Sequence, residues 1–353
     1  MSVISLNDLI HYAITHKASD LHLTCGHPPI LRINGDMFPL QVRLLTHEDL
    51  FSMLEKLLAD DQMERLRTVM ELDFSFSSEH GTRLRVNAFF TFNGPAMVLR
   101  LIPSELKTFE ELGLPPQVAK LTQISQGLIL VTGATGSGKS TSMAAMVDYI
   151  NRRRACHIIT IEDPIEYIFR SNRSVINQRE VGEHTKSFSN ALRSALREDP
   201  DVIMLGELRD KETITLALTA AETGHLVIAT LHTNSAPKTV DRIIDVFSEG
   251  EKDIARAMLS VSLKAVLTQT LLRRADGSGR VAALELLLNT SAVANLIRDN
   301  KIPQITSIMQ MNVKNGMITM KDSIDALVKK EIIGPDQANK TLKHISGMEA
   351  DDF

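Results

Sequence analysis

The chain has only two cysteines, and their scarcity excludes two kinds of small, cross-linked fold. Cys25 and Cys156 are isolated, and neither belongs to a C-x-x-C pair. A structural zinc site needs several closely spaced thiolate or imidazole ligands, and a disulfide framework needs paired cysteines. We therefore expect neither feature in this protein.

Long apolar runs and an excess of positive charge are absent as well. No stretch reaches the ~18 uninterrupted apolar residues that a membrane-spanning helix needs. Residues Met1 to Ser5 show no basic segment followed by an apolar one, so we expect no signal peptide. The formal net charge of −4 gives no reason to expect nucleic acid as a partner. We expect a cytoplasmic protein that does not insert into a membrane.

The length of 353 residues predicts two domains, because a single core of ordinary size does not extend over so long a chain. Residues 1–102 combine amphipathic helical segments with short stretches of alternating apolar and polar residues, which predicts a small α+β domain. The turn signals Asn34-Gly35 and Asn93-Gly94 fit hairpins within it. Residues 103–116 include three prolines and a glycine, which predicts a linker.

Residues 117–353 have a different texture. Short apolar segments alternate with longer helical ones, which is typical of an α/β fold with a mostly parallel sheet. Beyond residue 250 the pattern becomes mainly helical, with one alternating strand expected at Val281 to Leu287.

Residues Gly133 to Ser140 match the phosphate-binding loop G-x-x-x-x-G-K-[ST] at every position. The apolar, partly β-branched segment Leu128 to Thr132 precedes the motif and predicts a buried parallel strand. Apolar residues at helical spacing follow the motif and predict a helix. Such a loop presents backbone N–H groups to a phosphate, so we expect the chain to bind a nucleoside triphosphate.

Residues of this motif have distinct expected roles. Gly136 and Gly138 allow the backbone to approach a phosphate closely. Lys139 is expected to reach the β- and γ-phosphates, and the Ser140 hydroxyl to bind Mg²⁺, so ATP and Mg²⁺ are the expected cofactors. The residues expected to bind the nucleotide are Gly133, Ala134, Thr135, Gly136, Ser137, Gly138, Lys139, Ser140 and Thr141.

Acidic and histidine residues stand at or just beyond the ends of three further apolar segments. Because ligands of open α/β sheets gather beyond the carboxyl ends of the strands, we expect these side chains to meet the phosphates. Glu207 is expected to activate the attacking water, and Glu162 to hold or polarise the Mg²⁺ shell, although the two roles can be exchanged. His232 is expected to sense the γ-phosphate, with His225 as a second candidate.

Motifs in this half of the chain resemble those of the secretion and type IV pilus ATPases. They are an acidic box at Ile161 to Glu166, a Walker B segment at Asp201 to Asp210 and a histidine box at Gly224 to Asn234, together with the phosphate loop. In the amino-terminal region, Lys17 to Leu23 and Leu84 to Phe89 are similar to the first domain of the pilus retraction ATPases. Extension ATPases of the superfamily usually carry a tetracysteine zinc site, which two lone cysteines do not supply.

The resemblance implies a PAS-like amino-terminal domain, a RecA-like carboxyl-terminal domain and a hexameric ring. It implies an ATP-hydrolysing motor that retracts type IV pili from the cytoplasm, at the inner-membrane base of the pilus. The implied partners are further copies of this chain, an inner-membrane platform protein and a paralogous pilus ATPase. It also implies arginines that reach the nucleotide from the first domain, where Arg83, Arg85 and Arg100 stand at the matching positions.

Residues Ala292 to Asp299 resemble a helix that couples nucleotide turnover to pilus disassembly in the retraction ATPases. Ala294 stands where that family has an arginine, and Asp299 where it has a glutamate. These departures leave open whether the chain is a principal retraction motor or an accessory paralogue. The Walker B and histidine motifs favour the principal motor.

Other classes of function fit the sequence less well. A kinase built on the same loop needs an acceptor pocket and a lid, and no arginine-rich lid segment stands out. A nucleic-acid translocase needs a basic face, which the net charge of −4 disfavours. A scaffold that binds ATP without hydrolysing it is disfavoured by Glu207.

Overall fold

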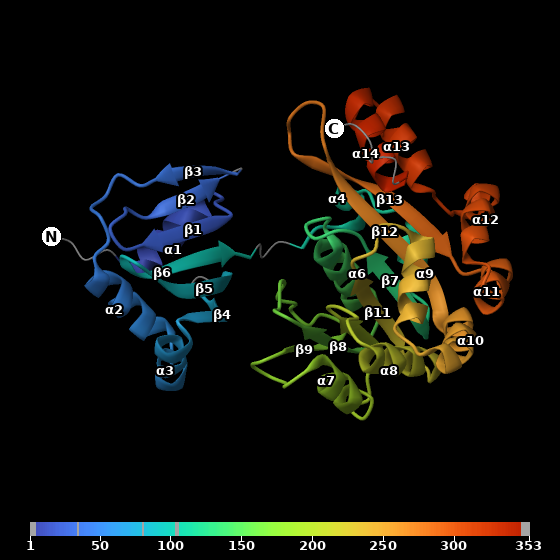
Figure 1. Cartoon of the computed structure of the whole chain (residues 1–353), viewed down its shortest axis with the longest axis horizontal. Helices are drawn as coiled ribbons and strands as arrows, with labels where there is room; N and C mark the ends of the chain where they lie inside the picture. The colour runs from blue at the N-terminus through green and yellow to red at the C-terminus, as the bar shows by residue number, and fades with distance from the viewer. Residues whose placement is uncertain (1–4, 34, 80, 103–105, 347–353) are drawn as a thin grey trace. The chain divides into compact units, whose positions relative to one another are not determined.

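The structure, a computed structural model, describes residues 5–33, 35–79, 81–102 and 106–346. The chain divides into two compact units, Met1–Glu105 with Glu166–Ile168, and Leu106–Ile165 with Phe169–Phe353 (Figure 1). The predicted fold class, an α+β region followed by an α/β region with a mostly parallel sheet, is confirmed.

The first unit is built on an antiparallel sheet with strand order β3-β2-β1-β6-β5-β4. Its strands are β1 (Asp20–Thr24), β2 (Ile30–Ile33), β3 (Asp36–Pro39), β4 (Glu71–Ser77), β5 (Arg83–Thr91) and β6 (Gly94–Leu101). The expected Asn93-Gly94 turn joins β5 to β6. In the other expected turn, Asn34 lies outside the described residues.

One face of this sheet carries the core of the first unit. Alternation along the strands buries Leu23 and Val86 in a cluster with helix residues such as Ile10 and Leu50. The helices are α1 (Leu6–Thr15), α2 (His47–Leu57) and α3 (Asp60–Val69). The same alternation sends the side chains of the intervening positions, which include Arg85 and Arg100, to the opposite face.

The second unit contains a seven-stranded sheet with strand order β13-β12-β7-β11-β10-β8-β9. All neighbouring strands run parallel except the β12–β13 pair. The strands are β7 (Gly127–Thr132), β8 (His157–Glu162), β9 (Val175–Glu180), β10 (Val202–Leu205), β11 (Leu226–Leu231), β12 (Leu263–Arg273) and β13 (Arg280–Leu288). The central strands β7, β10 and β11 are buried along their whole length, as their continuous apolar sequences predict.

Helices cover this sheet on both faces. Alternate strand residues share one large core with α7 (Phe188–Ala195), α8 (Lys211–Glu222), α9 (Ala236–Asp245) and α10 (Lys252–Ser262). Helix α6 (Lys139–Arg153) lies against the other face (Figure 1). The remaining helices are α4 (Phe109–Leu112), α5 (Pro116–Leu121), α11 (Ser291–Arg298), α12 (Ile305–Met311), α13 (Met320–Lys329) and α14 (Pro335–Ser346), with 3-10 turns at Glu249–Glu251, Ile302–Gln304 and Val313–Asn315.

The region beyond residue 250 is mainly helical as expected, but β12 is a second strand where the sequence predicts only one. It is eleven residues long and pairs with β7, which leads into the phosphate loop. No turn residue separates it from α10, which ends at Ser262 just before the strand begins at Leu263. The sequence pattern therefore gives no sign of the change from helix to strand.

The predicted linker was too long at its carboxyl end. Residues 103–105 lie outside the described part of the chain, and Leu106 onward belongs to the second unit. Thr108 and Glu111 form a capping box that starts α4. The ring of Phe109 stacks on that of Tyr149 in α6, with centroids 4.6 Å apart, so this segment is part of the domain.

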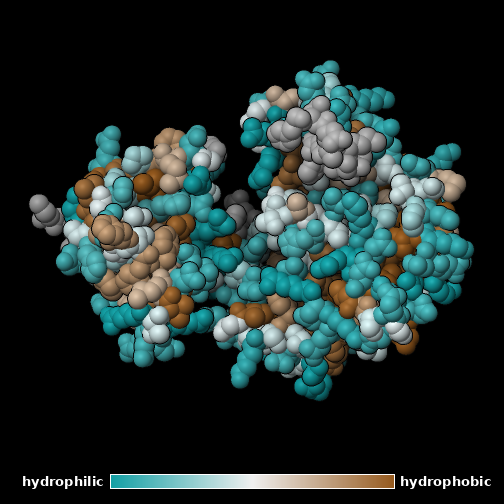
Figure 2. Space-filling view, viewed as in Figure 1, coloured by the Kyte–Doolittle hydropathy of each residue, from teal (hydrophilic) through white to brown (hydrophobic). Residues whose placement is uncertain are grey.

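The surface of the second unit is mostly polar. Hydrophilic side chains cover most of the face seen in Figure 2, with apolar ones scattered among them. Among the described residues, no helix combines the length and the apolar character required to cross a membrane.

Candidate functional site

The phosphate loop joins the carboxyl end of β7 to the amino end of α6, so the expected strand and helix both flank the motif. Gly133, Gly136 and Gly138 have φ angles of 142°, 77° and 90°. These values lie in a region that side-chain-bearing residues rarely adopt, which explains the glycines. Helix α6 begins at Lys139, and Gly138 occupies its N-cap position. The amino end of this helix therefore faces the loop, where it favours an anion.

Strand β12 fixes the shape of the loop, although no sequence motif marked it. A Cβ atom on Gly133 would lie 2.3 Å from the carbonyl oxygen of Gln269, so only glycine fits there. The Gln269 Nε2 atom donates to the carbonyl oxygen of Ser137 at 2.6 Å. The hydroxyls of Thr268 and Thr132 are 2.8 Å apart in a buried contact. These contacts make Thr268 and Gln269 supporting residues of the loop.

Lys139 is buried within the loop that it follows. Its Nζ atom donates to the carbonyl oxygens of Gly133 and Ala134 at 2.9 and 3.0 Å. The Nδ1 atom of His232 lies 3.5 Å from the same Nζ. His232 follows β11, so two neighbouring parallel strands deliver these groups to one place.

Glu207 extends this arrangement away from the loop. Its Oε1 lies 3.3 Å from the Nε2 of His232, and its Oε2 accepts a hydrogen bond from Arg209 Nε at 2.7 Å. Asp163 Oδ2 lies 3.9 Å from Arg209 Nη1. The pKa of Arg209 is raised, chiefly because its guanidinium donates to Glu207. A chain of polar contacts thus runs from Lys139 through His232 and Glu207 to Arg209 and Asp163.

Glu162 lies beside this chain at the end of β8. Only 5% of its surface is exposed, and its Oε1 accepts hydrogen bonds from Thr160 Oγ1 at 2.7 Å and Gln178 Nε2 at 3.1 Å. Its Cα lies 3.4 Å from the position that a Cβ would take on Gly206, next to Glu207. The two acids expected from sequence therefore stand on adjacent strands, and Glu162 is the more firmly held.

His225 is not brought to this site within the chain. It precedes β11, whereas His232 follows the same strand, so the two residues lie at opposite ends of that strand. The Nδ1 of His225 contacts the carbonyl oxygen of Ala220 at 3.0 Å, at the end of α8. The same Nδ1 lies 3.4 Å from Thr223 Oγ1. The expectation that His225 is a second sensor of the γ-phosphate is therefore not supported by its position.

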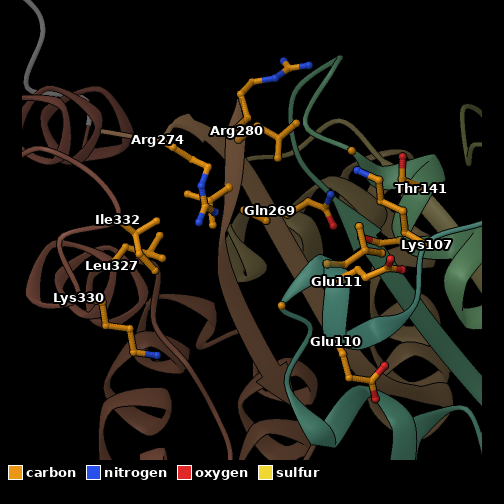
Figure 3. A pocket seen from close by; sticks show the side chains of 17 residues that line it. Lys107, Glu110, Glu111, Thr141, Gln269, Arg274, Arg280, Leu327, Lys330 and Ile332 are labelled. Atoms are coloured by element: carbon orange, nitrogen blue, oxygen red, sulfur yellow. The ribbon is translucent and has the colours of Figure 1, made fainter. Parts of the chain in front are cut away.

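A cavity of about 590 Å³ adjoins the phosphate loop at Gly138 and Thr141. Figure 3 shows Arg274, Leu327 and Ile332 on one side of it and Thr141, Lys107 and Glu111 on the other. Its lining mixes apolar side chains with cations and acids. No local sequence pattern predicts this cavity, because its walls come from α4, the β12–β13 hairpin and the segment after α13.

The three arginines of the first unit do not share one environment. Arg85 and Arg100 face each other across β5 and β6 and line a cavity of about 250 Å³ with Asp20 and Asp73. Arg100 Nε lies 2.9 Å from Asp20 Oδ1, and Arg85 Nε lies 4.0 Å from Asp73 Oδ1. Arg83 stands at the beginning of β5, outside this lining. Their role at the nucleotide stays a prediction.

Comparison with known proteins assigns the chain to a family. The family described as "Type II/IV secretion system protein" matches residues 2–331, which is most of the chain. The chain belongs to this family. A twitching motility protein of Neisseria gonorrhoeae is 51% identical to this secretion-family chain over 320 residues, covering 91% of it and 86% of the relative.

Relatives named as type IV pilus ATPases match most of the chain. The type IV pilus retraction ATPase PilT of Pseudomonas aeruginosa is 46% identical over 340 residues, which cover 96% of this chain and 98% of PilT. The type IV pilus ATPase PilU of the same organism is 40% identical over 316 residues, covering 90% of this chain and 83% of PilU. A crystal structure of the pilus retraction motor PilT with bound ADP matches with a TM-score of 0.90 and 46% identity, covering 96% of each chain. The predicted resemblance to the retraction ATPases is confirmed.

The segment expected to couple turnover to pilus disassembly forms α11 and the residue after it. Val293 and Ile297 are buried, while Asn295, Arg298 and Asp299 are exposed. Helix α11 therefore has one buried apolar side and one exposed polar side. Arg298 Nη1 lies 3.4 Å from Asn295 Oδ1 on the outer surface of the helix.

Proposed function

We propose that this chain is an ATP-hydrolysing motor that powers the retraction of type IV pili. The observation that carries the proposal is the contact chain of Lys139, His232 and Glu207 beside the phosphate loop. It supplies a cation, an imidazole and a carboxylate at the place where a γ-phosphate would react. Relatives named as retraction ATPase and twitching motility protein match over almost the whole chain and support the pilus assignment.

The loop fits a triphosphate because its glycines leave open the space that side chains would fill. Gly133 and Gly138 lie against β12, where a side chain would crowd Gln269. Lys139 then exchanges its bonds to the loop carbonyls for bonds to the β- and γ-phosphates. The adjoining cavity receives the base and the sugar, with Gln269 and Thr141 at its junction with the loop.

Glu207 is the proposed base that orients and deprotonates the attacking water. His232 and Arg209 hold its two carboxylate oxygens, so the group is oriented before the substrate arrives. Ser140 and Glu162 would hold Mg²⁺, which when bound would supply positive charge beside the phosphates. The hydrogen bonds from Thr160 and Gln178 suit Glu162 to this fixed role rather than to proton transfer.

The proposed working form is a ring of six copies in the cytoplasm, at the inner-membrane base of the pilus. A ring allows Arg83, Arg85 and Arg100 of one copy to reach the nucleotide of a neighbour, where their charge stabilises the departing phosphoryl group. An inner-membrane platform protein would receive the force, and a paralogous pilus ATPase is a further partner. Higher identity to PilT than to PilU favours the principal motor, whereas Ala294 and Asp299 favour the accessory one.

Phosphate release and cell motility test this proposal together. The purified chain should release phosphate from ATP with Mg²⁺ and no acceptor, which separates a motor from a kinase. Expression in cells that lack their own retraction motor should restore twitching, and Glu207→Gln at equal expression should not. If the chain hydrolysed ATP but did not restore twitching in cells that have their accessory ATPase, the proposed ATPase activity would stand. The proposed role as principal retraction motor would be overturned.

A further inference from the structure

A buried carboxylate lies between two helices that have no sequence motif in common. Glu285 is in β13, only 9% of its surface is exposed, and its Oε1 accepts a hydrogen bond from the backbone N–H of Ala236 at 2.6 Å. The backbone N–H of Met320 also stabilises its charge. Ala236 is the first residue of α9 and Met320 is the first residue of α13. One carboxylate thus serves the amino ends of two helices, where N–H groups lack partners within the helix.

The surroundings of Glu285 make this carboxylate costly. Its neighbours on the same face of β13 are Ala283, which shares a core with Met320, and Leu287, which shares a core with Ala236. Burial raises the pKa of Glu285, and the hydrogen bonds from the two backbone N–H groups only partly oppose this rise. An apolar residue would fill the place between two apolar cores at lower cost, unless the position of α9 matters.

Helix α9 begins shortly after His232, and the intervening residues are tied to the helix. The Thr233 and Thr239 hydroxyls are 2.7 Å apart, and Ser235 Oγ accepts from Lys238 N at 3.4 Å. These bonds join the segment after His232 to the first turn of α9. The bond from Ala236 to Glu285 then ties that turn to the sheet. The His232 ring, between Lys139 and Glu207, is therefore held at one remove by Glu285.

We propose that Glu285 is a positioning residue for hydrolysis, which holds His232 in place by fixing the first turn of α9 and joins that turn to α13. The inference rests on the proposed ATPase function, and it connects the nucleotide site through Glu285 to the carboxyl-terminal helices. Glu285 acts through His232 and does not touch the nucleotide. If Glu285 only stabilised the fold, its loss would weaken the protein without acting through His232.

A double-mutant cycle separates the two roles. Glu285→Ala should lower kcat by about 10- to 100-fold, with the KM for ATP changed by no more than about twofold, because a displaced side chain impairs the chemical step more than binding. In a His232→Ala chain the same change should lower kcat by no more than about twofold, since the residue through which it acts is gone. Glu285→Gln keeps an acceptor for Ala236 and should fall between the wild type and Glu285→Ala.

Asn289→Ala is the matched control. Asn289 directly follows β13, and its Nδ2 donates to the backbone carbonyls of Ser260 and Leu263 at 2.9 and 2.8 Å, away from α9. Its effect on kcat should be the same factor, within about twofold, in the wild-type and His232→Ala chains. Thermal unfolding identifies variants that do not fold, and if Glu285→Ala is one of them, Glu285→Gln takes its place in the cycle, with the same non-additivity expected.

Two results would overturn the inference while the proposed function stands. One is an equal loss of kcat on changing Glu285 in both backgrounds, and the other is wild-type turnover by His232→Ala. A wild-type chain that binds ATP and never releases phosphate would instead remove the proposed function, and this inference with it.

Discussion

Polar residues at the two ends of the parallel strands have different kinds of partner. At the amino ends of the strands, Asp201 Oδ2 accepts a hydrogen bond from the backbone N–H of His157 at 2.8 Å, and His225 Nδ1 contacts a carbonyl oxygen at 3.0 Å. At the carboxyl ends, His232 contacts two side chains, Lys139 and Glu207. At the amino ends the polar groups contact mainly the backbone, and two contacts join side chains, Asn177 Nδ2 to His157 Nε2 at 2.9 Å and Thr223 Oγ1 to His225 Nδ1 at 3.4 Å. At the carboxyl ends the side chains form a continuous series of contacts from Lys139 to Arg209.

Strand direction explains the difference. Helices begin beyond the carboxyl ends of the strands, and the free N–H groups of their first turns are donors for an anion. Loops also leave the strands at these ends, and they can carry side chains toward the site, because the strands are already paired. At the amino ends of the strands, the preceding helices end, and their last carbonyl groups need hydrogen-bond donors.

Removing the one loop cation should have the largest effect. Lys139→Ala should abolish measurable phosphate release and most ATP affinity, because the β- and γ-phosphates lose a fixed positive charge in a buried place. A fluorescent ATP analogue measures binding, and a phosphate assay measures turnover. Arg153→Ala, at the far end of the same helix, removes an equal charge and should leave both unchanged. Turnover near the wild-type rate in Lys139→Ala would refute the phosphate-loop assignment.

The carboxylate of the contact chain should come next. Glu207→Gln should still bind ATP, with kcat lowered on the order of 10³-fold, because the amide keeps the shape but does not accept a proton. Glu162→Gln is the informative comparison at the neighbouring strand. Glu162→Gln should weaken the binding of Mg²⁺, visible as a higher Mg²⁺ concentration at half-maximal rate. If the two variants exchanged these effects, the two acids would exchange roles.

The two histidines that precede and follow β11 test directly the comparison between the two ends of the strands. His232→Ala should lower kcat by about 100-fold, since it removes a preorganised polar group beside the reacting phosphate. His225→Ala changes the same residue type six residues of strand away and should lower thermal stability with little change in kcat. Equal losses of kcat would mean that His225 acts in catalysis, for example on the nucleotide of another copy.

Local patterns gave the parts of this site that a single segment encodes. The phosphate loop and the acids after apolar strands are recognisable because a strand and its following turn are adjacent in sequence. Strand β12 was missed, since it continues from α10 without a turn, and so were Gln269 and Glu285, which act through pairing between distant segments. His225 precedes β11 and His232 follows it, so the expected role of His225 at the γ-phosphate stays a prediction.

The smallest expected effect on turnover concerns α11, away from both ends of the strands. Arg298 is exposed, and the only described hydrogen bond of its side chain is to Asn295 of the same helix. Arg298→Ala should therefore change the free energy of unfolding by about 0.5 kcal/mol or less. Neither kcat nor the KM for ATP should change, because the residue touches no group of the nucleotide site. If α11 transmits force to the pilus machinery, twitching should nevertheless fail in cells that depend on this chain. Lys301→Ala removes an equal charge from the exposed segment just beyond the helix and should leave twitching intact. Loss of twitching in Arg298→Ala alone, at equal expression and equal phosphate release, would place the coupling surface on α11. Normal twitching in both variants would return α11 to a structural role.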